Sequence, residues 1–151
     1  MASASDVAAI VAVIVSIIGW TVVNDHNNKL ETRKEDRELI NDIKKRLRDI
    51  FELSVSYFCS EKSTKLSEKI KNDLDDLEIE IRRYVQFDCD AKIYLIYVNF
   101  FDSVTSGDFE SSSEEILDES SLQIINIKIS RNNLIQELEN NFTQKYYNKI
   151  I

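Results

Sequence analysis

The stretch DVAAIVAVIVSIIGWTVV, residues 6–23, decides how the rest of the chain is interpreted. Residues 7–23 carry no charge, and a helix built from them would present apolar or small side chains on every side. A surface helix of a globular protein has a polar face, and this one has none. At 1.5 Å per residue the run is roughly 25 Å long, or about 30 Å with its flanks, which is short but sufficient to cross the hydrocarbon of a bilayer.

Three interpretations fit an apolar run of this length: a retained membrane anchor, a cleaved signal peptide and a buried core helix. A signal peptide begins with basic residues, and MASASD has none; no small-x-small cleavage pattern follows Val23. A buried helix would need a large body to cover it. We therefore predict a transmembrane anchor over residues 1–24, in contact with the lipid bilayer, and keep the other two interpretations as alternatives.

The orientation of this anchor follows from the basic residues near its ends. None precedes the apolar run, whereas Lys29, Arg33, Lys34 and Arg37 follow it. Lysine and arginine are retained on the cytoplasmic side of a membrane, and indole rings favour the headgroup layer. We expect a single-pass protein of the inner membrane, N-out and C-in, with Trp20, Lys29, Arg33 and Lys34 at the inner interface.

One side of the predicted anchor carries small residues. Ala8, Ala12 and Ser16 are spaced four apart, and Gly19 lies close to the same side. Small side chains let two transmembrane helices approach closely, which predicts a homo-oligomer packed through Ala8, Ala12, Ser16 and Gly19. The alternative is that alanine and serine are simply common in membrane helices.

The remainder, residues 25–151, has the composition of a helical domain. Proline is absent and Gly107 is its single glycine, whereas a β-rich domain needs many turn residues. The net charge of −8 argues against nucleic acid as a partner, because phosphates are bound by basic surfaces. We predict an all-α protein: the anchor followed by a cytoplasmic bundle of about four helices.

The apolar spacing places these helices. Residues 24–31 form either a loop or a continuation of the anchor helix. Thr32-Arg33-Lys34-Glu35 resembles a capping box at the start of a helix that runs to about Cys59. A second helix begins near Thr64, and its apolar positions fall on one face. The two should form an antiparallel hairpin.

Two further helices are expected in the second half of the domain. AKIYLIYVNFF, residues 91–101, is apolar nearly all round, which favours a central buried helix, with a strand as the alternative. Residues 107–121 hold six acidic residues and five serines and are expected to be a solvated, mobile loop. The last helix should cover about 121–148. Its expected apolar face consists of Leu122, Ile125, Ile129, Ile135, Leu138, Phe142 and Tyr146.

No catalytic, cofactor or metal site is predicted. A Gly-rich phosphate loop is impossible with glycines only at 19 and 107. Two cysteines, Cys59 and Cys89, and the single histidine, His26, do not have the spacing of a zinc site. Because the predicted topology places the domain in a reducing compartment, both cysteines are expected to be free thiols.

The predicted architecture resembles one family. An N-terminal membrane helix followed by a four-helix body is similar to the membrane-anchored, HEPN-like accessory proteins of bacterial antiviral systems, including CRISPR-associated ones. HEPN ribonucleases carry Arg-x(4–6)-His; here no arginine precedes His26 and no histidine follows it, so the ribonuclease activity is not implied. The resemblance implies a non-enzymatic, self-assembling membrane effector or accessory that perturbs the membrane in antiviral defence. The alternative is a tethered adaptor that recruits a cytoplasmic protein partner.

Overall fold

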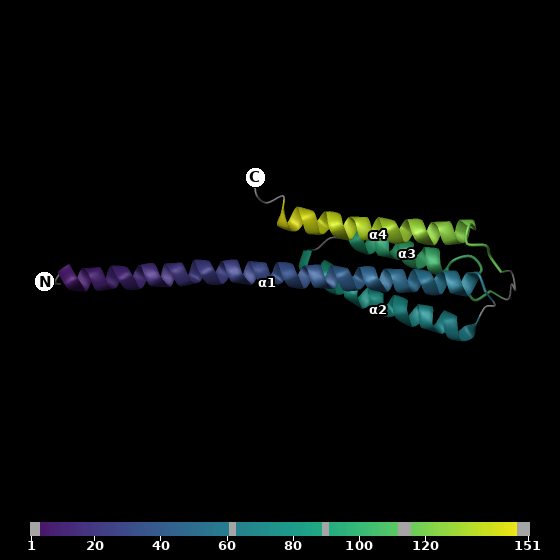
Figure 1. Cartoon of the computed structure of the whole chain (residues 1–151), viewed down its shortest axis with the longest axis horizontal. Helices are drawn as coiled ribbons and strands as arrows, with labels where there is room; N and C mark the ends of the chain where they lie inside the picture. Colours follow the sequence, from purple (N-terminus) through teal and green to yellow (C-terminus); the bar gives the residue numbers. More distant parts are fainter. Residues whose placement is uncertain (1–3, 61–62, 89–90, 112–115, 148–151) are drawn as a thin grey trace. The chain divides into compact units, whose positions relative to one another are not determined.

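The protein is described by a computed structural model that contains four α-helices (Figure 1). The backbone is described for residues 4–60, 63–88, 91–111 and 116–147, and side chains for the same ranges except 4–11 and 86–88. The helices are α1 (Ala4–Phe58), α2 (Thr64–Asp88), α3 (Ala91–Thr105) and α4 (Leu122–Tyr146). No strand occurs in these ranges, so the predicted all-α class is confirmed and the strand alternative for residues 91–101 is wrong.

The chain divides into two compact units, Met1–Asp36 and Arg37–Ile151, and each is described here by itself. Unit 1 consists of the first part of α1, and unit 2 holds the remainder of α1 with α2, α3 and α4. The division falls beyond residue 24, the predicted end of the anchor.

Helix α1 continues without a break through residues 24–31, as one of the two predicted alternatives required. The predicted capping box at Thr32 is wrong, because Thr32 lies inside the helix and its hydroxyl donates to the carbonyl of Asn28 at 3.0 Å. Lys29 and Asp25, one turn apart, form an ion pair of 2.7 Å that supports a stretch otherwise rich in weak helix formers.

Unit 2 is an up-down-up-down four-helix bundle in which each helix runs antiparallel to its two neighbours. Polar contacts join all four edges, and on the α2/α3 and α3/α4 edges the residue numbers fall on one helix as they rise on the next. They are Arg46–Glu80 and Arg46–Asp76 (α1/α2), Glu78–Tyr94 and Leu74–Tyr97 (α2/α3), Lys92–Glu137 and Ser103–Ser130 (α3/α4), and Arg37–Glu139 with Lys44–Glu139 (α1/α4). The predicted hairpin of α1 and α2 is therefore present.

The core of unit 2 is a continuous apolar cluster to which all four helices contribute residues. Most of its members are spaced three, four or seven apart on each helix, which is the pattern of a face turned inward. They are Ile40, Ile43, Leu47, Ile50, Tyr57, Phe58, Ile70, Leu74, Leu77, Ile81, Tyr84, Ile93, Tyr97, Phe100, Val104, Ile124, Ile127, Leu134, Leu138 and Phe142.

Helix α3 is less enclosed than its composition predicts. Ile93, Tyr97, Phe100 and Val104 are buried, but Leu95 on the outer side keeps 62% of its surface exposed. The prediction of a buried helix is therefore confirmed for one side of α3, while the other side faces solvent.

The predicted apolar face of α4 is wrong in its first half. Ile124 and Ile127 are buried, whereas Leu122, Ile125 and Ile129 are exposed. With α4 in this rotation, the Gln123 amide donates to the carbonyl of Ser103 at 2.8 Å. The helix ends at Tyr146, two residues before the predicted end at about 148, and Ser121 caps its start.

Three residues of the acidic segment between α3 and α4 contact the core of unit 2. The amide of Glu110 donates to the Tyr57 hydroxyl at 3.0 Å, and the amide of Leu117 donates to the Phe58 carbonyl at 2.8 Å. Phe109 also packs against Tyr57. These contacts anchor residues 109, 110 and 117, whereas most of the described segment is exposed, as expected of a solvated connection; residues 112–115 lie outside the described range.

Candidate functional site

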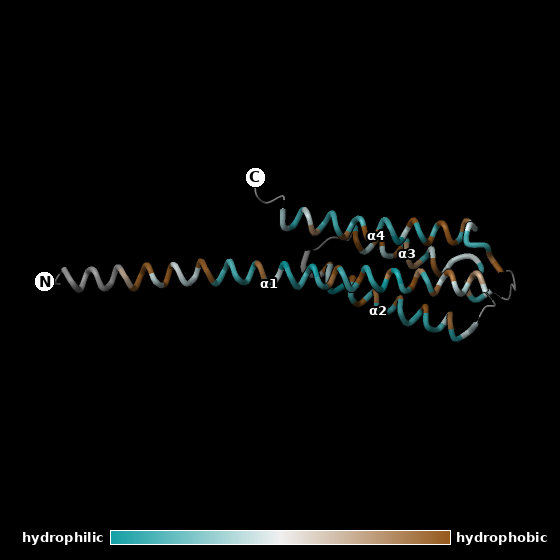
Figure 2. Tube along the Cα trace, viewed as in Figure 1, coloured by the Kyte–Doolittle hydropathy of each residue, from teal (hydrophilic) through white to brown (hydrophobic). Residues whose placement is uncertain are grey.

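The first candidate site is the apolar segment of α1, defined here as residues 12–23. Eight large apolar side chains in this segment are each between 50% and 69% exposed, and they project on all sides of the helix. They are Val13, Ile14, Val15, Ile17, Ile18, Trp20, Val22 and Val23. Figure 2 shows the described part of this stretch as predominantly hydrophobic, followed by a hydrophilic stretch of α1.

The polar groups within the apolar segment are satisfied inside the helix itself. The Ser16 hydroxyl donates to the carbonyl of Ala12 at 2.8 Å, and the Thr21 hydroxyl donates to the carbonyl of Ile18, also at 2.8 Å. Neither hydroxyl needs water as a partner, so the segment can be surrounded by apolar material without leaving a polar group unpaired.

The predicted packing residues Ala12, Ser16 and Gly19 share one side of α1, at spacings of four and three. All three are exposed. Apart from the backbone of its own helix, no described atom lies within 4 Å of the position that a Cβ on Gly19 would occupy. The side is thus open for another helix. Ala8, the fourth predicted packing residue, lies outside the residues whose side chains are described.

The predicted interface residues follow directly. Trp20 is 69% exposed, Lys34 is exposed, and Arg33 is partly buried. Lys29 is held by Asp25. Within the described part of the chain, no helix is both long enough and apolar enough to cross a membrane.

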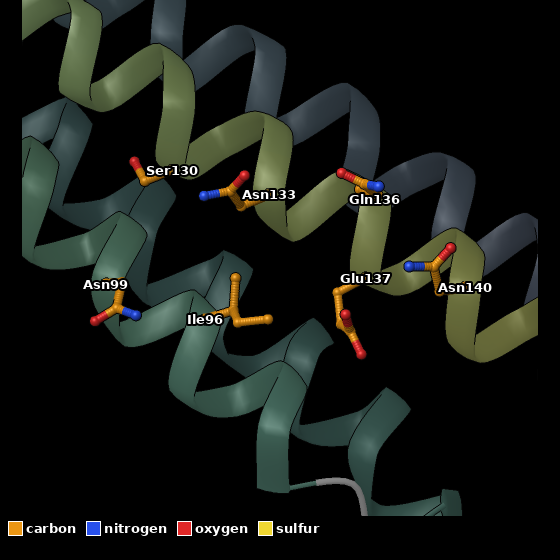
Figure 3. A pocket seen from close by; sticks show the side chains of 7 residues that line it. All are labelled: Ile96, Asn99, Ser130, Asn133, Gln136, Glu137 and Asn140. Atoms are coloured by element: carbon orange, nitrogen blue, oxygen red, sulfur yellow. The ribbon is translucent and has the colours of Figure 1, made fainter.

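The second candidate site is a groove of about 370 Å³ between α3 and α4, which we call the amide groove (Figure 3). Antiparallel packing of these helices forms it, with the Ser103–Ser130 hydroxyl contact of 2.6 Å toward one end and the Lys92–Glu137 ion pair of 2.7 Å toward the other. It is lined by Ile96 and Asn99 of α3 and by Ser130, Asn133, Gln136, Glu137 and Asn140 of α4.

The amide groove was not predicted from the sequence, although its signal is present there. Asn133, Gln136 and Asn140 are spaced by three and four, so they lie on one face of α4. None of these three carboxamides, nor Asn99, hydrogen-bonds another described side chain or backbone group. Four carboxamides with open donors and acceptors therefore meet at one surface.

The carboxyls of Glu139 and Glu78 in unit 2 form ion pairs with basic side chains. The hydrogen bond from Lys44 lowers the pKa of the Glu139 carboxyl, helped by Arg37 and opposed by partial burial. The Arg82 guanidinium, with Tyr94, lowers the pKa of Glu78 in the same way. Both carboxyls are thereby held in their charged, paired form, which is the behaviour of a structural ion pair.

Cys59 and the acidic residues show no metal-binding arrangement within the described ranges. No three His, Cys, Asp or Glu side chains there converge as ligands. Cys59 is a free thiol, and partial burial raises its pKa, with Glu119 and Asp118 adding to the shift. Cys89 lies outside the described residues, so its predicted state stays a prediction.

Comparisons of the chain with protein-family models, with curated proteins and with solved structures gave no match.

Proposed function

We propose that this chain is a single-pass membrane protein that assembles with copies of itself through its anchor and carries unit 2 on the cytoplasmic side. The observation that supports the anchor is the apolar segment of α1, whose large side chains are exposed on every side. A helix that is apolar all round is stable where apolar material surrounds it, and the hydrocarbon of a bilayer is such a surrounding.

The dimensions and the energetics of residues 7–23 agree with this proposal. Ten valines and isoleucines lie in this run, and each contributes ~−0.3 to −0.6 kcal/mol to insertion when near the bilayer centre. If all ten lay at that depth their sum would be about −3 to −6 kcal/mol, which is an upper bound in magnitude because residues near the ends of the run contribute less. The polar stretch that follows, with Lys29, Arg33 and Lys34, favours a cytoplasmic C-terminal side.

The proposed assembly uses the open side formed by Ala12, Ser16 and Gly19. Without a hydrophobic driving force between helices in lipid, close packing at small residues supplies much of the association energy. Under this proposal the protein is a non-enzymatic effector or accessory: unit 2 controls clustering, and clustered anchors disturb the bilayer. Its place in antiviral defence stays a prediction.

Leucine substitutions test the packing side. Ala12→Leu with Ser16→Leu fills the open side and should reduce the oligomer size of the full chain in lipid nanodiscs. The matched control is Ile14→Leu with Ile18→Leu, which keeps the small residues and adds the same number of leucines. Equal oligomer size in both double variants would remove the basis for packing at this side.

The alternative is a tethered adaptor, and one feature favours it. A second groove, between α1 and α2, is lined by Asp49, Glu52 and Asp73 with Lys69 and Leu53, a surface suited to a basic partner. Dye leakage from cells that express the full chain separates the two functions. The effector should cause dye to leak when it clusters, whereas the adaptor should cause no leakage.

A further inference from the structure

We infer that the amide groove is a contact between two copies of this chain, formed by the α3/α4 face of one copy against the same face of another. The inference rests on the proposed self-assembly, and it names a second surface for that assembly, in unit 2.

The chemistry of the groove matches a second copy of itself. A carboxamide has an N–H₂ that donates and a carbonyl that accepts, so one carboxamide can pair fully with another. In a two-fold contact the same patch meets itself, and each donor on one copy finds an acceptor on the other. Asn99, Asn133, Gln136 and Asn140 supply four such groups, and none is used within the described part of the chain.

The amide groove carries almost no net charge, so two copies can approach each other there although the whole chain is acidic. The chain carries a net charge of −8, so two copies resist approach through most surfaces. Glu137 is the one charged residue in the lining, and Lys92 neutralises it at 2.7 Å. The groove between α1 and α2, by contrast, holds three carboxylates and a single lysine.

Exposed apolar residues border the amide groove and enlarge the contact. Ile129 lies one turn before Asn133 on α4, and Leu95 lies one turn before Asn99 on α3; both are exposed. An apolar side chain beside paired amides is the composition of an interface centre, where charged residues are depleted. Copies held in one membrane meet at high effective concentration, so a modest contact suffices.

Paired aspartate substitutions test this inference on the full chain. Asn133→Asp with Asn140→Asp keeps the shape of both side chains and adds two negative charges that would oppose each other across the contact. Like charges placed together cost enough to weaken association about tenfold or more. The matched control is Asn41→Asp with Asn72→Asp, which adds the same charge at exposed positions of α1 and α2.

The readout is cross-linking of two differently tagged copies in vesicles from expressing cells. We expect the Asn133/Asn140 pair to lower the cross-linked yield and the control pair to leave it unchanged, with equal melting temperatures for both. Co-expression with a chain carrying Asn133→Lys and Asn140→Lys should restore mixed pairs. Restoration identifies the second copy as the occupant of the groove.

Three outcomes would overturn the inference. Equal yields from the two aspartate pairs would show that the copies do not meet at this face; the anchor proposal would survive if the Ala12/Ser16 variant still dissociates the protein. Loss of a cross-link to a different protein, with the homotypic yield unchanged, would assign the groove to that partner. A full chain that is monomeric in every form would refute both the inference and the proposed assembly.

Discussion

The substitution Ile18→Lys discriminates most sharply between an apolar segment held in lipid and one held in water. Ile18 is 56% exposed and lies in the middle of the apolar segment. In lipid, the change removes about 0.3–0.6 kcal/mol of favourable insertion energy and adds ~2.5–3.5 kcal/mol for a lysine near the bilayer centre. The total, about 3–4 kcal/mol, is comparable with the whole insertion energy of residues 7–23. In water, the same change at an exposed position shifts stability by no more than about 0.5 kcal/mol.

The assay places a glycosylation acceptor and a spacer before Met1 and translates the chain with microsomes. The acceptor is modified only when the N-terminus crosses the membrane, so the modified fraction reports insertion in the predicted orientation. We expect the fraction to fall from nearly complete to about half or less for Ile18→Lys. The control Asn27→Lys places the same charge in the polar part of α1 and should leave the fraction unchanged. Equal fractions for the two variants would refute the reasoning.

Three further predictions concern unit 2, each measured by thermal or denaturant unfolding of the full chain. Phe100→Ala should cost about 3–5 kcal/mol because Phe100 is fully buried, whereas Leu95→Ala on the solvent face should cost well under half as much. Gly107→Ala should cost about 1 kcal/mol, because Gly107 has a φ of +66° and a Cβ there would approach the Gln123 side chain. The folded-state pKa of Glu139 is lowered, so its contribution is present above the unfolded pKa of about 4.3 and is lost as the pH falls through the folded value. Glu139→Gln should therefore flatten the loss of stability on acidification below about pH 4.5, and an unchanged acid profile would contradict this assignment.

The existence and type of the helices could be predicted from the sequence because their apolar spacing is regular. Ile70, Leu74, Leu77 and Ile81 occupy one face of α2 and all four are buried, as the spacing requires. The absence of proline also favoured helices, because a β-rich domain needs many turn residues. The capping motif at Thr32 misled because the same residues are compatible with a helix interior, and nothing upstream of it breaks the helix.

The rotation of α4 and the path of the acidic segment could not be predicted, because distant contacts decide them. Leu122, Ile125 and Ile129 have the same helical spacing as a buried face, yet Ile124 and Ile127 are buried instead, in a rotation that also allows the Gln123–Ser103 and Ser103–Ser130 hydrogen bonds. Polar pairing between helices is a tertiary effect that single-sequence spacing does not contain. The amide groove escaped prediction for the same reason, since it exists only where α3 and α4 meet.

Within the apolar segment, Ser16 and Thr21 illustrate what the sequence did provide. As polar residues in an uncharged run they need hydrogen-bond partners, and their hydroxyls donate to carbonyls of their own helix. The wider prediction, that lipid surrounds residues 7–23, remains the claim on which the proposed function depends.

Alkaline carbonate washing of membranes from cells that express the unmodified full chain tests that claim most directly. We expect the intact polypeptide to stay in the membrane pellet with integral proteins. Release of the uncleaved chain into the supernatant would contradict it.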